Sequence, residues 1–222
     1  MIGAIALGGL GGVDRAAFGQ TMFAHPVVCG TLAGWVAGDP LNGLRLGIVF
    51  GMFASRRAPI GGAGPVLDWT SAAICVPFAL GASAAGWQWG LGLVVGLVVA
   101  LLGGRSILGL RGLAASGEVV ALSAASDGDP APLERFHLRM IGLHILRGAA
   151  TVLLATLALS SLAFDIRWSL PEQSAAAMVW GLAPLSAAVV LVHAHLRHAG
   201  WRWVGLGVVA SGLLILLAGA AA

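Results

Sequence analysis

Long apolar runs separated by short polar segments dominate the chain. A helix that crosses the hydrocarbon core of a bilayer needs about 20 apolar residues. Five stretches reach or approach this length, at residues 69–85, 87–104, 141–163, 175–192 and 203–221. Between the first two, Gly86-Trp87-Gln88-Trp89 is typical of a tight hairpin with tryptophans at the membrane interface. The pattern predicts an all-α, polytopic integral membrane protein with five full spans.

A further apolar stretch, residues 27–53, is interrupted at Gly38-Asp39-Pro40. Proline removes a backbone hydrogen-bond donor, and an aspartate is costly in lipid. Interrupted helices occur at membrane depth where the backbone faces protein or a water-filled cavity. We therefore predict two half-helices here, as broken or re-entrant elements, rather than one straight span.

Composition excludes the other broad classes of protein. Of the 222 residues, 59% are hydrophobic and 9% are charged, whereas a soluble domain carries about 25% charged residues. So few charges cannot cover a water-facing surface, and a disordered chain needs low hydrophobicity and high charge. We expect residues 1–222 to form a single membrane domain.

The distribution of charge suggests an orientation in the membrane. All twelve basic residues are arginines, and the formal net charge is +3. The arginines form no basic stripe, so we expect no nucleic-acid partner. Because basic residues accumulate on the cytoplasmic side, we place the longest polar segment, residues 105–140, in the cytoplasm. Counting the spans back puts Arg56-Arg57 on the same side, and Arg15 and His25 as well if residues 27–53 form a re-entrant or hairpin element.

Side chains that could carry catalysis or bind a metal form no recognisable set. Cys29 and Cys75 lie in apolar stretches, and we interpret them as small buried hydrophobic residues. His193, His195 and His198 lack the i, i+4 spacing of a helical zinc pair, so we interpret them as interfacial histidines. No arrangement of serine, cysteine or paired carboxylates suggests hydrolysis. We expect no catalytic residue, no metal site and no cofactor.

His137, His144 and Arg147 follow one another at spacings of seven and three, which places them on one face of a helix. Such a stripe lines an internal cavity or forms a polar seam between packed helices. The sequence leaves both alternatives open.

Most polar residues in apolar surroundings lie in the first third of the chain. They are Asp14, Gln20, His25, Asp39, Asn42, Arg45 and Asp68. A charged group near the bilayer centre costs about 2.5–3.5 kcal/mol on insertion scales, so this cluster requires a reason. The functional interpretation is a water-accessible pocket for a small polar solute. The alternative is that Asp14, Asp39 and the pair Arg56-Arg57 lie at membrane interfaces, where they cost little.

Glycine and proline are dense just before Asp68, in Pro59-Ile60-Gly61-Gly62-Ala63-Gly64-Pro65. Glycine allows positive φ and close backbone approach, and proline restricts the chain on either side. We therefore predict a structural loop, non-helical or re-entrant, with a simple surface turn as the alternative. Its key residues are Gly61, Gly62, Gly64 and Pro65. A phosphate-binding loop is not indicated, because the Gly-Lys-Ser/Thr ending is absent.

Several short motifs in this region occur together. They are Gly12-Val13-Asp14-Arg15-Ala16-Ala17-Phe18-Gly19-Gln20, His25-Pro26-Val27-Val28, Gly38-Asp39-Pro40 with Gly43, and Ile60-Gly61-Gly62-Ala63. Together they resemble the membrane IIC subunit of mannose/sorbose-type sugar phosphotransferase systems. Farther along, His137 and Arg147 match a His and an Arg that open a later family helix. The resemblance is specific over the N-terminal motifs and thinner over the rest.

The resemblance implies a multi-pass protein of the bacterial inner membrane that translocates sugar. In this family, IIC and IID form the membrane channel, while cytoplasmic IIA and IIB phosphocarriers relay phosphate from phosphoenolpyruvate to the entering sugar. The IIC subunit carries no phosphohistidine, so the chain is not expected to be catalytic alone. Family members move sugar by an elevator-like rearrangement of an oligomeric IIC–IID complex. The implied partners are IID, IIA, IIB, the sugar substrate, membrane lipid and further copies of the subunits.

The resemblance and the polar cluster together nominate a sugar-binding set. Carboxylate and amide side chains suit a hydroxyl-rich ligand, because together they accept and donate hydrogen bonds. The candidate substrate-binding residues are Asp14, Gln20, His25, Asp39, Asn42 and Asp68.

Several positions depart from the family pattern. A family glutamate before the Gly-rich loop aligns with Gly51, and the Arg of an Arg-Pro pair is His25. The acid after the loop is shifted to Asp68, and Arg56-Arg57 replace apolar and small residues. Losing a pocket carboxylate weakens sugar binding by a few kcal/mol if its hydrogen bonds are not replaced. A second hypothesis is therefore an orphan IIC-like scaffold or regulatory protein that no longer transports sugar. A third, a vitamin-type uptake subunit, requires the motif match to be chance.

Overall fold

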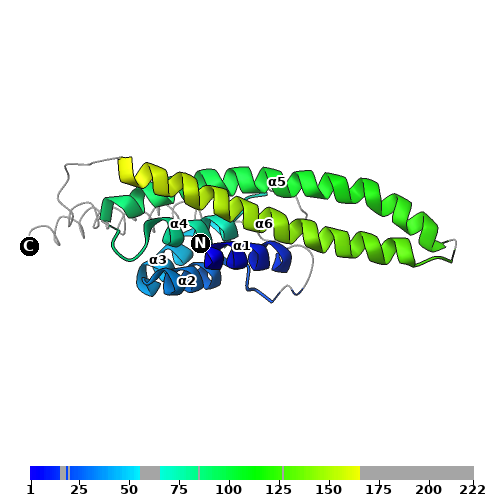
Figure 1. Cartoon of the computed structure of the whole chain (residues 1–222), viewed down its shortest axis with the longest axis horizontal. Coiled ribbons are helices and arrows are strands. Elements are labelled where there is room, and N and C mark those ends of the chain that lie inside the picture. The colour runs from blue at the N-terminus through cyan, green and yellow to red at the C-terminus, as the bar shows by residue number, and fades with distance from the viewer. Residues whose placement is uncertain (16–18, 20, 56–65, 85, 127, 166–222) are drawn as a thin grey trace, which may run out of the picture.

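The computed structural model describes residues 1–15, 19, 21–55, 66–84, 86–126 and 128–165. Within these residues it contains six helices and no strand. They are α1 (Ile2–Asp14), α2 (Pro26–Ala37), α3 (Pro40–Ser55), α4 (Trp69–Leu80), α5 (Gly86–Ser126) and α6 (Ala131–Asp165). In Figure 1, α5 and α6 lie side by side as a long hairpin. α1 and α4 pack against one part of it, and α2 and α3 pack against α4. The predicted all-α fold class is confirmed.

α5 and α6 are longer than a membrane is thick. They have 41 and 35 residues, which corresponds to about 60 Å and about 50 Å, against about 30 Å for the hydrocarbon core of a bilayer. Each contains a window that is long and apolar enough to cross a membrane. The polar segment 105–140 is therefore mostly helix that continues from the apolar halves of α5 and α6. The chain reverses near Gly128, whose φ is +95°.

The predicted helix break at Gly38 is confirmed, since α2 and α3 form a helical hairpin there. Gly38 has a left-handed backbone (φ +92°), and the N–H of Asp39 donates to the carbonyl oxygen of Gly34 at 2.8 Å. The two helices touch through glycines, because a Cβ on Gly30 would lie 2.8 Å from the carbonyl oxygen of Gly43. With 12 and 16 residues, or about 18 Å and 24 Å, neither helix crosses a bilayer alone.

α1 packs closely against α6, also through glycines. A Cβ on Gly8 would lie 2.8 Å from the carbonyl oxygen of Gly148, and a Cβ on Gly12 would lie 2.5 Å from that of His144. A larger residue at either position would push the helices apart, which is why small residues line such contacts in membrane proteins. The contact places the end of α1 beside the middle of α6.

α4 is the centre of the described core rather than a full span. It has 12 residues, and every residue from Trp69 to Pro77 is buried. α4 contacts α1, α2, α3, α5 and α6. The prediction of a full span over residues 69–85 is therefore wrong, because the helix ends at Leu80 and is only about 18 Å long. An apolar segment covered by protein on all sides has the same composition as one covered by lipid.

Trp89 corrects a second expectation. It was predicted at the membrane interface, but it is 2% exposed and belongs to the buried cluster that also contains Phe50 and Val76. Cys29 and Cys75 are buried and free, as predicted. Other predicted features lie outside the described residues, namely Gln20, the loop at 59–65, the spans at 175–192 and 203–221, and His193, His195 and His198.

Candidate functional site

Asp68 caps the N-terminus of α4. Its Oδ1 accepts a hydrogen bond from the N–H of Ser71 at 3.1 Å, and its Oδ2 accepts one from the Ser71 hydroxyl at 2.8 Å. The N–H of Asp68 donates to the carbonyl oxygen of Ala100 in α5 at 2.8 Å. Gly103 permits this approach, because a Cβ there would lie 2.7 Å from the Cβ of Asp68. The Asp68 side chain is therefore enclosed between α4 and α5.

Two arginines from distant parts of the chain bind the Asp68 carboxylate. Nη1 of Arg147, in α6, lies 2.6 Å from Oδ2, and Nη1 of Arg15, just after α1, lies 3.3 Å from Oδ1. Arg15 also donates through Nη2 to the carbonyl oxygen of Leu67 at 2.6 Å. A buried charge is strongly unfavourable unless it is paired and hydrogen-bonded, and these contacts pair Asp68. We call Asp68, Ser71, Arg15 and Arg147 the Asp68 cluster.

The Asp68 cluster has a surplus of positive charge, since it contains two guanidinium groups and one carboxylate. Nε of Arg147 and Nδ1 of His144 are both buried and have no hydrogen-bond partner among the described residues. Positive charge and unused hydrogen-bonding capacity suit an anionic or hydroxyl-rich ligand.

Of the stripe His137, His144 and Arg147, two residues, His144 and Arg147, form part of a polar seam between packed helices. His144 is buried, and Arg147 reaches from α6 to Asp68 at the start of α4. His137 is exposed and lies outside the seam. Within the described ranges, no group of three or more His, Cys, Asp or Glu side chains could hold a metal ion.

Asp14 holds the turn that connects α1 to α2. Its Oδ1 accepts hydrogen bonds from the N–H and the hydroxyl of Thr21, at 2.7 and 2.8 Å, and its Oδ2 accepts one from the N–H of Ala24 at 2.8 Å. The carboxylate is buried. In this conformation Asp14 thus satisfies three donors of its own chain.

His25 and Asp68 lie close to the same turn. His25 caps α2, with Nδ1 accepting from the N–H of Val27 at 3.3 Å. The hydroxyl of Thr70, two residues after Asp68, donates to the carbonyl oxygen of Ala24 at 2.5 Å. The structure therefore brings together Asp14, His25 and Asp68, three of the predicted sugar-binding residues. We call these three residues and Thr70 the polar layer.

Asp39 and Asn42 lie at the opposite end of α2. Asp39 caps α3, accepting from the N–H of Asn42 at 3.0 Å and from its side-chain amide at 2.7 Å. Asn42 in turn accepts from Nη1 of Arg45 at 3.0 Å. Because α2 has 12 residues, this network is about 18 Å from His25. The structure does not bring these two predicted residues to the polar layer.

Gly51, where the sequence resemblance predicts a glutamate in other family members, faces His25 of the polar layer. A Cβ at this position would lie 3.1 Å from Cγ2 of Val27 and 3.4 Å from Cε1 of His25. A side chain at residue 51 would therefore begin beside His25. A glutamate at this position would belong to the polar layer and not to the Asp39 end of the hairpin.

Two residues of this region, Arg15 and Thr70, are not singled out by sequence reasoning as site residues. The sequence signal for Arg15 is indirect. A carboxylate in apolar surroundings, such as that of Asp68, requires a cationic partner, but the sequence does not say which one. Thr70 has no such signal, since its hydroxyl acts through the carbonyl oxygen of Ala24, 46 residues away.

Apolar helices, two of them long enough to cross a bilayer, enclose buried charged and polar side chains. This combination is consistent with the class of helical membrane proteins that have a polar interior. The family model described as "PTS system sorbose-specific IIC component" matches residues 1–190. The chain therefore belongs to the family of sorbose-specific IIC components of phosphotransferase systems, which confirms the resemblance. No curated protein and no solved structure matches the chain.

Membership in this family indicates a membrane location and a complex with other proteins. IIC components are embedded in the membrane and are parts of sugar phosphotransferase systems. They form a membrane complex with other components of the same system.

Proposed function

We propose that the chain is the sugar-translocating IIC subunit of a phosphoenolpyruvate-dependent phosphotransferase system of mannose/sorbose type. Residues 1–222 would form one multi-pass domain in the bacterial inner membrane. The proposed partners are a IID membrane subunit and the cytoplasmic IIA and IIB phosphocarriers, in an oligomeric complex. Phosphoryl transfer belongs to IIA and IIB in this proposal, and the chain supplies the sugar site and path. Membership in the family supports this function.

The observation that carries the proposal is the convergence of the polar layer. Asp14 and Thr70 bind opposite sides of the same residue, Ala24, through its N–H and its carbonyl oxygen. His25 follows directly in sequence, and Asp68 lies two residues before Thr70. Sugar hydroxyl groups donate and accept hydrogen bonds, so neighbouring carboxylates, an imidazole and the guanidinium groups of the Asp68 cluster suit them. We place the sugar at this layer.

In this proposal Asp39 and Asn42 do not contact sugar. Their hydrogen bonds run within one turn at the start of α3. They stabilise the α2–α3 hairpin and so support the polar layer from a distance.

Uptake of sugar driven by phosphoenolpyruvate tests the proposal. The measurement uses cells that express the full chain together with the IID, IIA and IIB proteins of a mannose/sorbose-type system. Asp14→Asn removes a carboxylate charge from the polar layer, and loss of one charged hydrogen bond to a sugar hydroxyl, about 1.5–3 kcal/mol, corresponds to roughly 10- to 100-fold weaker sugar binding. The matched control is Asp39→Asn, the same change at the far end of α2, which should leave sugar affinity unchanged.

Two measurements separate a binding defect from a folding defect. The amount of inserted protein is compared between variants, and sugar affinity is measured on the purified IIC–IID complex. If Asp39→Asn lost sugar affinity and Asp14→Asn kept it, the sugar site would lie at the Asp39 end of the α2–α3 hairpin. That result would contradict the proposal. Gly51→Glu, which puts a carboxylate beside His25, should strengthen sugar binding if the polar layer is the site.

A second candidate function is an orphan IIC-like scaffold or regulatory protein. It is favoured by Gly51 in place of the family glutamate, and by the carboxylates of Asp14, Asp39 and Asp68, which are all occupied by hydrogen bonds within the chain. Correctly inserted protein that gives no uptake, before and after Gly51→Glu, would support this function. Uptake by the natural sequence would exclude it.

A further inference from the structure

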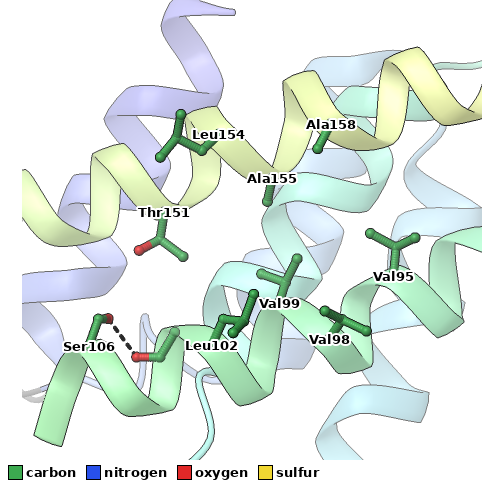
Figure 2. A pocket seen from close by; sticks show the side chains of 10 residues that line it. Val95, Val98, Val99, Leu102, Ser106, Thr151, Leu154, Ala155 and Ala158 are labelled. Carbon is green, nitrogen blue, oxygen red and sulfur yellow. Dashed lines mark hydrogen bonds between the residues drawn. The ribbon is translucent and has the colours of Figure 1, made fainter.

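A pocket of about 520 Å³ lies between α5 and α6, outside the polar layer. Its walls are aliphatic, with Val95 and Val98 on α5 and Leu154 and Ala158 on α6. Figure 2 shows that Ser106 lies toward one end of this pocket and Val95 toward the other. From Val95 to Ser106 the lining follows α5 for eleven residues, or about 16 Å. An apolar space of this form suits a hydrocarbon chain and not a sugar.

One end of the pocket is polar. Ser106 and Thr151 line it there, and the Ser106 hydroxyl lies 3.5 Å from Nη1 of Arg147. Arg147 is one turn before Thr151 on α6, its side chain is 8% exposed, and its Nε has no hydrogen-bond partner among the described residues. Arg147 shares the single carboxylate of Asp68 with Arg15. The polar end of the pocket therefore adjoins an uncompensated positive charge.

A second cation lies at the same level on α5. Arg105 is exposed, and it follows Leu102 by three residues and Val98 by seven, so it lies at the edge of the pocket-lining face of the helix. The preceding residues 87–104 contain no charged side chain. The pocket thus runs from the apolar half of α5 to the point where charged residues begin, which is the membrane–water boundary of a spanning helix.

We propose that the pocket between α5 and α6 binds an anionic phospholipid. An acyl chain lies along Val95, Val98 and Leu154, and the phosphate group lies at Ser106, within reach of Arg105 and Arg147. A neutral occupant would leave the positive charge at the polar end unmatched, whereas a phosphate complements it, as basic pockets between membrane helices do for acidic lipid headgroups. The proposal depends on the membrane location of the family and not on sugar transport.

Lipid binding to the purified full-length chain tests the proposal. Native mass spectrometry in detergent compares phosphatidylglycerol with phosphatidylcholine carrying the same acyl chains. We expect preferential retention of phosphatidylglycerol. Arg105→Gln should weaken its binding about fivefold, which corresponds to about 1 kcal/mol for one arginine near a lipid surface. The matched control is Arg139→Gln, which removes an exposed arginine of the same hairpin about 12 Å before Arg147 along α6.

A second pair of variants tests the apolar part of the pocket. Ala158→Phe fills the pocket at its apolar end, where residue 158 is exposed, so it should reduce retention of both lipids without disturbing the core. Leu157→Phe, at the neighbouring exposed position outside the pocket lining, should have no effect. Equal effects of Ala158→Phe and Leu157→Phe would overturn the proposal. Equal binding of phosphatidylglycerol and phosphatidylcholine would also overturn it, and so would equal effects of Arg105→Gln and Arg139→Gln.

A photo-crosslinking residue at Val98 identifies the occupant in the native membrane. Adducts with phospholipid support the proposal. Adducts formed mainly with residues 166–222 of the same chain, or with another membrane protein, would show that protein fills the pocket and would overturn it. Free inorganic phosphate is then added to the mass spectrometry sample to ask whether the site binds phosphate alone rather than a phospholipid. Displacement of the lipid by phosphate alone would contradict a role for the acyl chain.

Discussion

Asp68 and Asp39 have the same local function in different surroundings. Each caps a helix, α4 or α3, and each accepts a hydrogen bond from the backbone N–H three residues later, at 3.1 Å and 3.0 Å. The second carboxylate oxygen of Asp39 binds the side chain of Asn42 in the same turn. Asp68 is almost fully buried and binds Arg15 and Arg147, which come from two other parts of the chain.

The comparison shows that one capping interaction can be local or can hold a tertiary structure together. The Asp39 network involves residues three apart, so it forms as soon as the α2–α3 hairpin does. The Asp68 cluster joins the end of α1, the start of α4 and the middle of α6, with partners 53 and 79 residues away. Perturbing the first should affect one hairpin, and perturbing the second should affect the packing of the whole described core.

The largest expected effect is that of Asp68→Asn. The change keeps the shape of the side chain but leaves the buried guanidinium group of Arg147 and the half-buried one of Arg15 without a counter-charge. Breaking a buried ion pair in this way costs about 3–5 kcal/mol. Equilibrium unfolding of the purified chain in mixed micelles measures the loss. Asp39→Asn is the matched control and should cost much less. Similar losses for the two variants would show that burial of Asp68 carries no additional free energy.

Removal of Arg147 should have the next largest effect. Arg147→Gln leaves Asp68 with Arg15 and Ser71, so the loss is that of one charged hydrogen bond, about 1.5–3 kcal/mol. Arg15→Gln should cost less, because Arg15 is more exposed, at 28% against 8%, and its contact is longer, at 3.3 Å against 2.6 Å. The same unfolding measurement ranks the two. A larger loss for Arg15→Gln would contradict this order of the contacts.

The smallest expected effect is that of Asp39→Ala. Loss of an N-cap side chain costs about 0.5–2 kcal/mol, and no buried charge is left behind. Combined with Asp68→Asn, the losses should add to within about 0.5 kcal/mol, because distant sites without shared partners behave independently. A double-mutant cycle measures this sum. Strong coupling would show that the α2–α3 hairpin and the Asp68 cluster unfold as one unit.

Some features could be predicted because they depend on local chemistry. The break at Gly38 follows from a glycine, an aspartate and a proline in succession, and the structure confirms it. The apolar halves of α5 and α6 follow from composition. The length of α4 could not be predicted, because burial among five helices and burial in lipid select the same apolar residues. Trp89 was misplaced for the same reason, since a large ring fills a core as well as it lies at an interface.

The candidate site was predictable in part. Asp14, His25 and Asp68 could be nominated, because ionisable residues in apolar surroundings require a reason. Their separation from Asp39 and Asn42 could not be inferred, since it depends on the direction in which α2 runs between the two groups.

The sequence by itself determined the class of protein, the all-α fold, the break in the α2–α3 hairpin and the identity of the family. These follow from hydrophobicity and from motifs in which the interacting residues are near one another. Only the tertiary structure decided that Arg15 and Arg147 share Asp68, that α4 is a core helix, and that the polar end of the α5–α6 pocket lies beside Arg147. Such pairings depend on contacts between residues far apart in the chain, and nothing in a local pattern specifies which distant charge a buried carboxylate will bind.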